Sequence, residues 1–352
     1  MPLLLKHWKK YARPLVCGKK KLNRKNMKTE FVPSYIESLS ELKKFGIDSV
    51  VVAIGVFDGV HKGHAKLLHE LQKMAISLSA YPVAMTFFPH PKSVLFPENA
   101  PLLLLPPNEK LRLICRNGAK AVVSLPFTKE FALLSPEDFL QKCLFGHDVE
   151  VKGICVGHDW KFGNKGKGDR FFLEKAALEK GFLFKAVEEL RKEDGKTVSS
   201  TAIRECIAKG ELSEAEKMLG RPYRFYGVVE KGYQVAGKIL ATPTANLKLQ
   251  YGVLPPLGVY AAMVDVEGKI YPAAMNVGVA PTFEARYGKI EPRIELHLLV
   301  PPEESLYGKY ISAELVSFIR EEKKFDSPAL LKEQIGKDIQ QILQAITEKE
   351  KN

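Results

Sequence analysis

Two histidines, His61 and His64, are the side chains whose types and spacing first suggest chemistry in this chain. They end the run G-V-F-D-G-V-H-K-G-H of residues 55–64, which joins a predicted strand to a predicted helix. Its glycines let the backbone approach a ligand closely, and a helix N-terminus presents free N–H groups with partial positive charge. We therefore interpret the run as a phosphate-binding turn. A plain tight turn and a pair of metal-binding histidines are the alternatives.

Three further polar runs could contact a nucleotide. His90 lies between two prolines, which hold it rigidly after another predicted strand. Asp159 could bind a ribose hydroxyl, although an aspartate in a glycine-containing turn is also a common turn former. In the run S-S-T-A-I-R of residues 199–204, three hydroxyls and the Arg204 guanidinium suit pyrophosphate, whereas the same run could also begin a capped helix.

Polar residues nearer the end of the chain suggest a second site. Glu295 and His297 are two residues apart, so they would point to the same face of a strand. Glu295 could take a proton from a hydroxyl nucleophile. Thr244 and Asn246 offer oxygen ligands that suit Mg²⁺ and phosphate. From the residues alone, an exposed polar face and a turn after Pro243 would explain the same pattern.

The elements that must position the first group of residues alternate between strand and helix. Helices are predicted after His64, over residues 108–117 and from Ser135, which precedes a proline and two acidic residues as a helix cap would. This alternation predicts a parallel sheet covered on both faces. The predicted strands are residues 49–54, 83–87, 121–125 and 151–156.

The second part of the chain contains strands separated by Gly and Pro turns, which predicts a β-barrel or a β-sandwich. These strands are residues 259–266, 270–277, 293–299 and 311–318. A helix from Ser327 to about Ile346 follows. Its apolar positions should pack on the barrel, and they are Leu330, Leu331, Ile335, Ile339, Ile342 and Ile346.

Length and composition exclude several classes of protein. A chain of 352 residues suggests two domains, and 45% hydrophobic with 27% charged residues is typical of a soluble globular protein. No apolar run approaches the roughly 20 residues of a membrane span. The 5 scattered cysteines form no C-x-x-C pair, which argues against a disulfide framework and favours a reducing cytoplasm.

The net charge of +12 comes mostly from the N-terminal end of the chain. Nine of the 53 basic residues precede Met27, where Asp and Glu are absent, so the rest of the chain is close to neutral. We interpret residues 1–29 as a disordered extension, or as translated sequence upstream of a start at Met27, rather than as a nucleic-acid-binding arm.

Seven separated motifs resemble those of the bacterial bifunctional riboflavin kinase/FAD synthetase family, and the resemblance runs from about residue 45 to 338. Trp160 replaces a usual phenylalanine in the third motif. The motifs are residues 55–64, T-F-F-P-H-P at 86–91, V-G-H-D-W-K-F-G at 156–163, S-S-T-A-I-R at 199–204, L-G-R-P-Y at 219–223, P-T-A-N at 243–246 and E-L-H at 295–297.

The resemblance implies a fold and two reactions. Residues 30–212 would form an α/β nucleotidylyltransferase domain with a parallel, Rossmann-like sheet that transfers AMP from ATP to FMN. Residues 213–352 would form a β-barrel flavokinase domain with a C-terminal helix, which phosphorylates riboflavin. The implied ligands are ATP, Mg²⁺, riboflavin, FMN and FAD. We expect no membrane or nucleic-acid partner.

The same resemblance assigns roles to individual residues. Catalysis would fall to His61, His64 and Glu295, ATP or phosphate binding to Gly55, Phe57, Asp58, Gly59, His90, Asp159, Ser199, Ser200, Thr201, Arg204 and Gly237, and metal binding to Thr244 and Asn246. Three departures from the family pattern concern the kinase half. Ala236 stands where a basic residue is common, Ala241 replaces a glycine, and Val300 replaces an aspartate.

Two alternatives to this interpretation stay open. In one, the adenylyltransferase half alone is active, and the barrel binds flavin without phosphorylating it. In the other, the protein binds RNA or charges tRNA, because H-x-G-H also occurs in class I synthetases. The chain lacks a lysine-rich partner motif, and its aromatic residues are not interleaved with the basic run, which argues against this second alternative.

Overall fold

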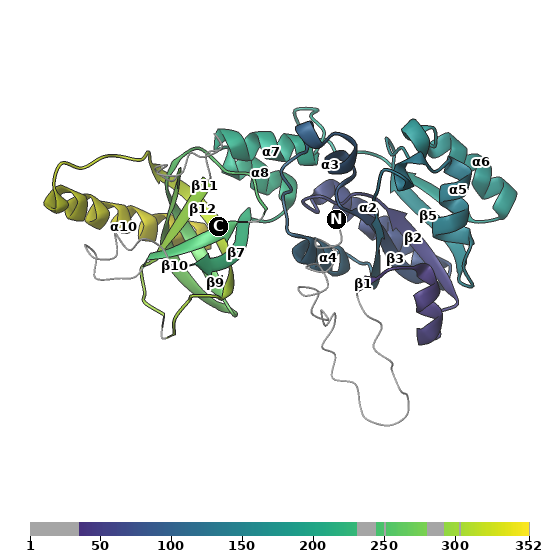
Figure 1. Ribbon diagram of the computed structural model, residues 1–352, viewed down its shortest axis with the longest axis horizontal. Helices are drawn as coiled ribbons and strands as arrows, with labels where there is room; N and C mark the ends of the chain where they lie inside the picture. The colour runs from purple at the N-terminus through teal and green to yellow at the C-terminus, as the bar shows by residue number, and fades with distance from the viewer. Residues whose placement is uncertain (1–34, 231–243, 250, 280–291, 303, 352) are drawn as a thin grey trace, which may run out of the picture. The chain divides into compact units, whose positions relative to one another are not determined.

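The computed structural model describes residues 35–230, 244–249, 251–279, 292–302 and 304–351. The basic extension of residues 1–29 lies outside this part, as do Ala236, Gly237 and Ala241. The chain divides into two compact units (Figure 1). The first contains the residues up to Pro101 together with Pro107–Val198, and the second contains Leu102–Pro106 together with the residues from Ser199 on. The domain boundary after residue 212 stays a prediction.

The first unit is built on a six-stranded sheet in which every neighbouring pair is parallel, as predicted. Strands β3 and β4 lie on one side of β2, and β5 and β6 lie on the other, so the strand order reverses beside β2. Open α/β sheets bind ligands at the carboxyl ends of the strands at such a reversal. In order across the sheet the strands are β1 (Tyr35–Ile36), β4 (Ala121–Pro126), β3 (Tyr81–Phe88), β2 (Ser49–Ile54), β5 (Glu150–Gly157) and β6 (Leu183–Val187).

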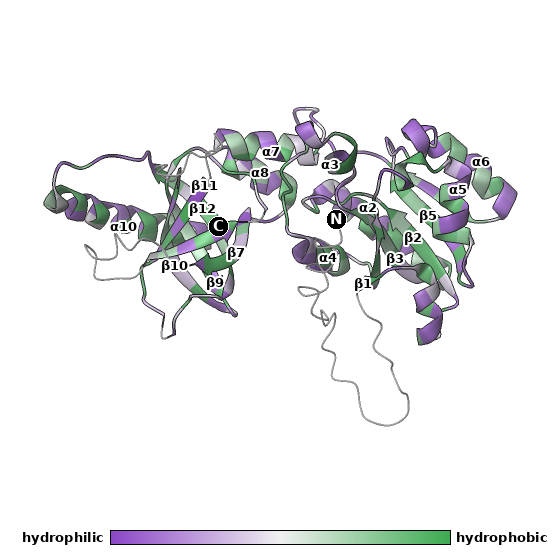
Figure 2. Cartoon of the chain, viewed as in Figure 1, coloured by the Kyte–Doolittle hydropathy of each residue, from purple (hydrophilic) through white to green (hydrophobic). Residues whose placement is uncertain are grey.

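Strand β2 shows why the sheet forms. Its residues Val50–Ile54 are fully buried, which is expected of a central parallel strand covered on both faces. The neighbouring strands are similarly apolar, and they appear largely as hydrophobic in Figure 2. A continuous apolar run bounded by polar residues is therefore enough to predict this strand with its observed bounds.

Helices connect the strands of the first unit: α2 (Lys62–Ser77), α3 (Pro91–Leu95), α4 (Pro107–Arg116), α5 (Pro136–Leu140) and α6 (Arg170–Lys180). Ser135 caps α5, as predicted, by accepting a hydrogen bond from the Asp138 N–H. The prediction that a helix begins after His64 was wrong by three residues. Helix α2 begins at Lys62 because the side chain of His61 caps it.

The second unit contains a closed antiparallel barrel, so the predicted barrel is confirmed and the sandwich is not. The strands are β7 (Arg224–Glu230), β8 (Thr244–Leu249), β9 (Gly258–Val266), β10 (Lys269–Val279), β11 (Pro292–Leu298) and β12 (Tyr310–Arg320). Closure joins them in the order β10-β11-β8-β7-β12-β9 and leaves no exposed sheet edge.

In the described part of the second unit, the helices are α7 (Ser200–Lys209), α8 (Leu212–Leu219) and α10 (Pro328–Lys351). Ile342 and Ile346 of α10 are buried against the barrel, as predicted. Leu330 is exposed, so its predicted contact is wrong. The helix packs through its later turns, and it extends past the barrel on one side (Figure 1). Within the described ranges, no helix is long and apolar enough to cross a membrane.

Candidate functional site

The predicted phosphate turn follows β2 directly and folds back on itself. Phe57 and Val60 have φ angles of 54° and 38°, and Gly59 has a φ of 77°. A Cβ atom at Gly55 would lie 3.2 Å from the Phe57 ring, so a larger residue would require this buried ring to shift slightly. Non-glycine residues held at positive φ carry a cost that is common at ligand-binding turns.

The two histidines of the turn lie together at the N-terminus of α2. Nδ1 of His61 accepts a hydrogen bond from the His64 backbone N–H at 3.3 Å, and the two rings stack with centroids 3.7 Å apart. Because Nδ1 is the acceptor, the neutral His61 ring carries its proton on Nε2 and can donate from there. A Cβ atom at Gly63 would lie 3.0 Å from the His61 ring, so a larger residue would require this ring to shift.

His90 repeats the arrangement of His61 after the neighbouring strand β3. Its Nδ1 accepts a hydrogen bond from the Lys92 backbone N–H at 3.1 Å and caps the short helix α3. Asp159 follows β5, on the other side of β2, and its side chain is exposed. The segments that follow β2, β3 and β5 carry His61, His90 and Asp159. These strands are adjacent and parallel, so the three segments meet at one edge of the sheet.

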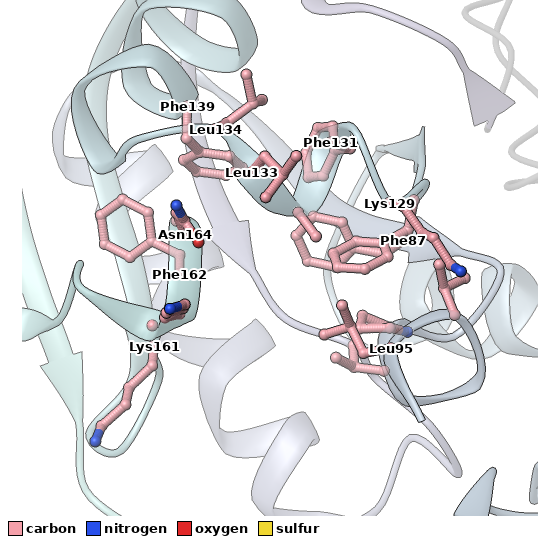
Figure 3. Close-up of a pocket in the computed structure, with 18 of the residues that line it drawn as sticks. Phe87, Leu95, Lys129, Phe131, Leu133, Leu134, Phe139, Lys161, Phe162 and Asn164 are labelled. Carbon is pink, nitrogen blue, oxygen red and sulfur yellow. The ribbon is translucent and has the colours of Figure 1, made fainter. Parts of the chain in front are cut away.

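A large apolar cavity of about 840 Å³ opens beside this edge (Figure 3). Val56 and Phe87, which come from the ends of β2 and β3, line one part of it. Aromatic rings line much of the rest, and the packed series runs through Phe127, Phe131, Phe139, Trp160 and Phe162. In Figure 3 the Phe162 ring lies on one side of the cavity, with Phe131 and Phe87 on the other. Cavities of this size and lining suit a flat, largely apolar ring system.

The sequence alone indicated only part of this cavity. Phe87 and Trp160 belong to recognised motifs, but Phe131 and Phe139 come from a connecting segment without a chemical pattern. A cluster of phenylalanines over residues 127–139 was the available signal. Lys110, whose ammonium group contacts the Val56 carbonyl of the turn, carried no such signal.

The hydroxyl run begins α7 in the second unit. Ser199 caps this helix by accepting a hydrogen bond from the Ala202 N–H at 3.2 Å, so the capped-helix interpretation holds for this residue. Thr201 is exposed. Nε of Arg204 donates to the Leu102 carbonyl at 2.7 Å, which orients the guanidinium. Pyrophosphate binding by Ser199, Ser200, Thr201 and Arg204 stays a prediction.

The candidate kinase base lies on β11, where burial alternates strictly. Ile294, Leu296 and Leu298 are buried in the barrel, so Glu295 and His297 share the opposite face, as predicted. Burial lowers the pKa of His297 below its usual value. Val300 lies just beyond the strand and is exposed.

Glu295 forms a compact polar group with two neighbours. Nη2 of Arg293 lies 2.6 Å from Oε1 of Glu295, and Nε of the same arginine donates to Oδ1 of Asn246 at 3.1 Å. Asn246 pairs with Glu295 across β8 and β11, and Thr244 pairs with His297. The backbone therefore places Asn246 directly opposite the candidate base and Thr244 two residues away, opposite His297. The side chain of Thr244 lies outside the described part of the structure.

The oxygens of this group fit Mg²⁺, because the ion prefers carboxylate and amide oxygen ligands and leaves further positions for water and phosphate. Within the described residues, no three His, Cys, Asp or Glu side chains converge as a metal cage would require. The fit therefore rests on one amide and one carboxylate, both now bonded to Arg293.

Two family models match the chain: FAD synthetase over residues 45–202 and riboflavin kinase over residues 219–346. The bifunctional riboflavin kinase/FMN adenylyltransferase of Escherichia coli (strain K12) is 36% identical over 304 residues, which cover 86% of this chain and 95% of that protein. The chain belongs to this family. The Bacillus subtilis (strain 168) member is 34% identical and covers 83% of this chain and 91% of its own length.

This family member therefore carries both enzymatic domains, one for riboflavin phosphorylation and one for FMN adenylylation. The alternatives of an adenylyltransferase with an inactive barrel and of an RNA-binding protein are not favoured. A solved Streptococcus pneumoniae structure, described as a macrolide-efflux protein, matches with a TM-score of 0.73 at 30% identity and covers 87% of this chain and 97% of that chain. Its name describes another activity, so this likeness supports the fold.

Proposed function

We propose that the turn of residues 55–64 binds the triphosphate of ATP and that His61 and His64 stabilise charge during adenylyl transfer. A phosphate oxygen of FMN attacks the α-phosphorus of ATP, the bond to the leaving pyrophosphate breaks, and no proton needs to be removed from the nucleophile. Catalysis then depends on positioning and on charge stabilisation. The support is the location of both rings at the N-terminus of α2, beside the strand reversal.

The flavin ring of FMN occupies the apolar cavity in this proposal. The cavity is the single observation that carries it, because Val56 belongs both to the cavity wall and to the segment that enters the phosphate turn. A ring bound there would leave its phosphate near the carboxyl edge of the sheet. His90 and Asp159 extend from the same edge and would contact the nucleotide, while Ser199, Ser200, Thr201 and Arg204 would contact the pyrophosphate.

In the barrel, Glu295 acts as the general base that removes the proton from the terminal ribityl hydroxyl of riboflavin. The oxygen then attacks the γ-phosphorus of ATP, and ADP leaves. A hydroxyl is a poor nucleophile until its proton is taken, so this reaction needs a carboxylate where adenylyl transfer does not. Thr244 and Asn246 would hold Mg²⁺, which would neutralise phosphate charge when bound. Gly237 would approach the nucleotide phosphates.

One experiment tests both halves at once. The purified protein is incubated with riboflavin, ATP and Mg²⁺, and the flavins are separated by chromatography. The expected result is FMN followed by FAD. Formation of FAD from supplied FMN, without FMN formation from riboflavin, would contradict the kinase assignment and leave the adenylyltransferase assignment intact.

The compartment we propose is the cytoplasm. Within the described residues, Cys143 and Cys155 are buried free thiols. Burial raises the pKa of Cys143 to about 12, so this thiol stays protonated and unreactive. Free buried thiols agree with a reducing compartment.

A further inference from the structure

We propose that Lys110 is a positioning residue for adenylyl transfer, which fixes the ends of β2 and β3 so that the phosphate turn and the flavin cavity keep one geometry. Lys110 is the fourth residue of α4, at the end of its first turn, and it is half-buried next to Val56 of the phosphate turn. Lys110 is not among the residues that line the cavity. Its effect on the reaction would pass through backbone groups that it holds.

Three acceptors from two strand ends surround the Lys110 ammonium group. Nζ lies 3.3 Å from the Val56 carbonyl oxygen, 3.2 Å from Oγ1 of Thr86 and 3.3 Å from the Phe87 carbonyl oxygen. Oγ1 of Thr86 also donates to the Val56 carbonyl at 3.0 Å, which closes the group. An ammonium ion has three N–H donors, so the number of donors matches the number of acceptors.

The carbonyl groups bonded to Lys110 belong to residues of both proposed substrate regions, the flavin cavity and the phosphate turn. Val56 and Phe87 line the flavin cavity, and Val56 directly precedes Phe57, where the chain turns to positive φ. Strand β2 ends at Ile54, and Gly55 N–H still bonds to the Met85 carbonyl, so the Val56 carbonyl is beyond the regular ladder. Without Lys110, this carbonyl would keep only the Thr86 hydroxyl as a donor within the described residues, and the path of the turn would be less restricted.

The charge of Lys110 is set by its surroundings. Burial lowers the pKa of the ammonium group to about 8, and the negative charge of Asp58 partly opposes this shift. Asp58 is itself buried within the phosphate turn. On α4, the neighbouring Glu109 is paired with Arg112 at 2.7 Å. Thr86 and the two carbonyl groups that face Lys110 from β2 and β3 do not titrate.

The consequence is a loss of positioning at mildly alkaline pH. As the pH rises through about 8, Lys110 loses a proton, and a neutral amine has two donors for three acceptors. We expect FAD synthesis from FMN to decline over the same range in the wild-type protein. Small displacements of reacting groups can cost on the order of 10²-fold in rate, so a clear decline is expected.

The decisive variant is Lys110→Met, which keeps the aliphatic stem and removes the charge and all three donors. At pH 7.5 we expect its kcat/KM for FAD synthesis to fall about 10- to 100-fold, with no further decline between pH 7 and 9. Lys175→Met is the matched control, because Lys175 is an exposed lysine on α6 of the same unit. It should keep the wild-type rate and the wild-type pH profile.

If Lys110 only stabilised the fold, the activity and the pH profile of Lys110→Met would differ from those expected of a positioning residue. Loss of activity in Lys110→Met with an unchanged pH midpoint would overturn the proposal, and so would a rate within twofold of wild type. If Lys110→Met does not fold, the wild-type profile still decides, because absence of any decline in FAD synthesis between pH 7 and 9 would contradict the proposal. Riboflavin phosphorylation, measured in the same samples, should keep its own pH dependence in every variant.

Discussion

His61 caps the helix that carries His64, through a hydrogen bond of 3.3 Å from the His64 backbone N–H to Nδ1 of His61. The same bond orients the His61 ring against the His64 ring and assigns the His61 proton to Nε2. One imidazole thus has two functions, because it stabilises the helix terminus with one nitrogen and presents a donor with the other. These two functions can be separated by substitution.

His61→Asn should separate capping from catalysis. Asparagine is a good N-cap residue, so the variant should keep its stability, but it lacks the Nε2–H donor at the same reach. We expect FAD formation to fall about 10²- to 10³-fold, which is the scale for loss of one preorganised donor. FAD formation from supplied FMN, together with thermal unfolding, measures both effects.

His61→Ala completes this comparison. It should lose the same activity and also about 1 kcal/mol of unfolding free energy, because the cap is removed. Riboflavin phosphorylation by the barrel should continue in both variants. Equal loss of the two enzymatic activities would show that His61 acts by maintaining the fold.

The sequence predicted the strands better than the residues that support the site. A central parallel strand such as Ser49–Ile54 is a continuous apolar run, so its pattern and its structure agree. Lys110 could not be found in this way, because a lysine on an amphipathic helix is usually solvated and its acceptors come from strands more than twenty residues away. The predicted contact of Leu330 was wrong for a related reason. Helical periodicity identifies the apolar face of a helix, but it does not show which turns of that face pack on the barrel.

Glu295→Gln should abolish FMN formation while FAD formation from supplied FMN continues. The amide keeps the shape of the carboxylate but accepts no proton. Glu333→Gln is the matched control, because Glu333 is an exposed carboxylate on α10 that pairs with Lys337. Separate assays of the two reactions measure the result, and a near-normal kinase rate in Glu295→Gln would rule out this residue as the base.

Arg293 offers a second test of the kinase site. It bonds to both the candidate base and Asn246, so Arg293→Ala should release two groups that the proposal assigns to proton transfer and Mg²⁺ binding. We expect the Mg²⁺ concentration needed for half-maximal FMN formation to change by several-fold, and FAD formation to keep its own Mg²⁺ dependence. An unchanged Mg²⁺ dependence of FMN formation would argue against a metal site at Asn246.

Phe131→Ala tests the flavin cavity. The Phe131 ring packs with Phe127 and Phe139 along the cavity wall, and an aromatic contact contributes about 1 kcal/mol beyond its buried area. We expect the KM for FMN to rise about 10-fold, with little change in the KM for ATP. Phe171→Ala is the control, because Phe171 is an exposed phenylalanine in the same unit and does not line the cavity. A rise in the KM for ATP alone would place the nucleotide, rather than the flavin, in this cavity.

Asp338→Ala should destabilise the barrel without acting on either reaction. Asp338 is almost fully buried, and it accepts hydrogen bonds from Nε and NH2 of Arg320 and from the side chain of Gln334. Removing one partner of a buried ion pair leaves the other charge uncompensated, which typically costs about 3–5 kcal/mol. Urea-induced unfolding of the second unit should show this loss, whereas Glu333→Ala, which breaks an exposed pair on the same helix, should stay within about 1 kcal/mol of wild type. A loss below about 1 kcal/mol in Asp338→Ala would mean that water replaces the carboxylate at Arg320, and that the remaining contacts of α10, which include buried Ile342 and Ile346 and the Lys349–Glu314 pair, are sufficient to hold the helix on the barrel.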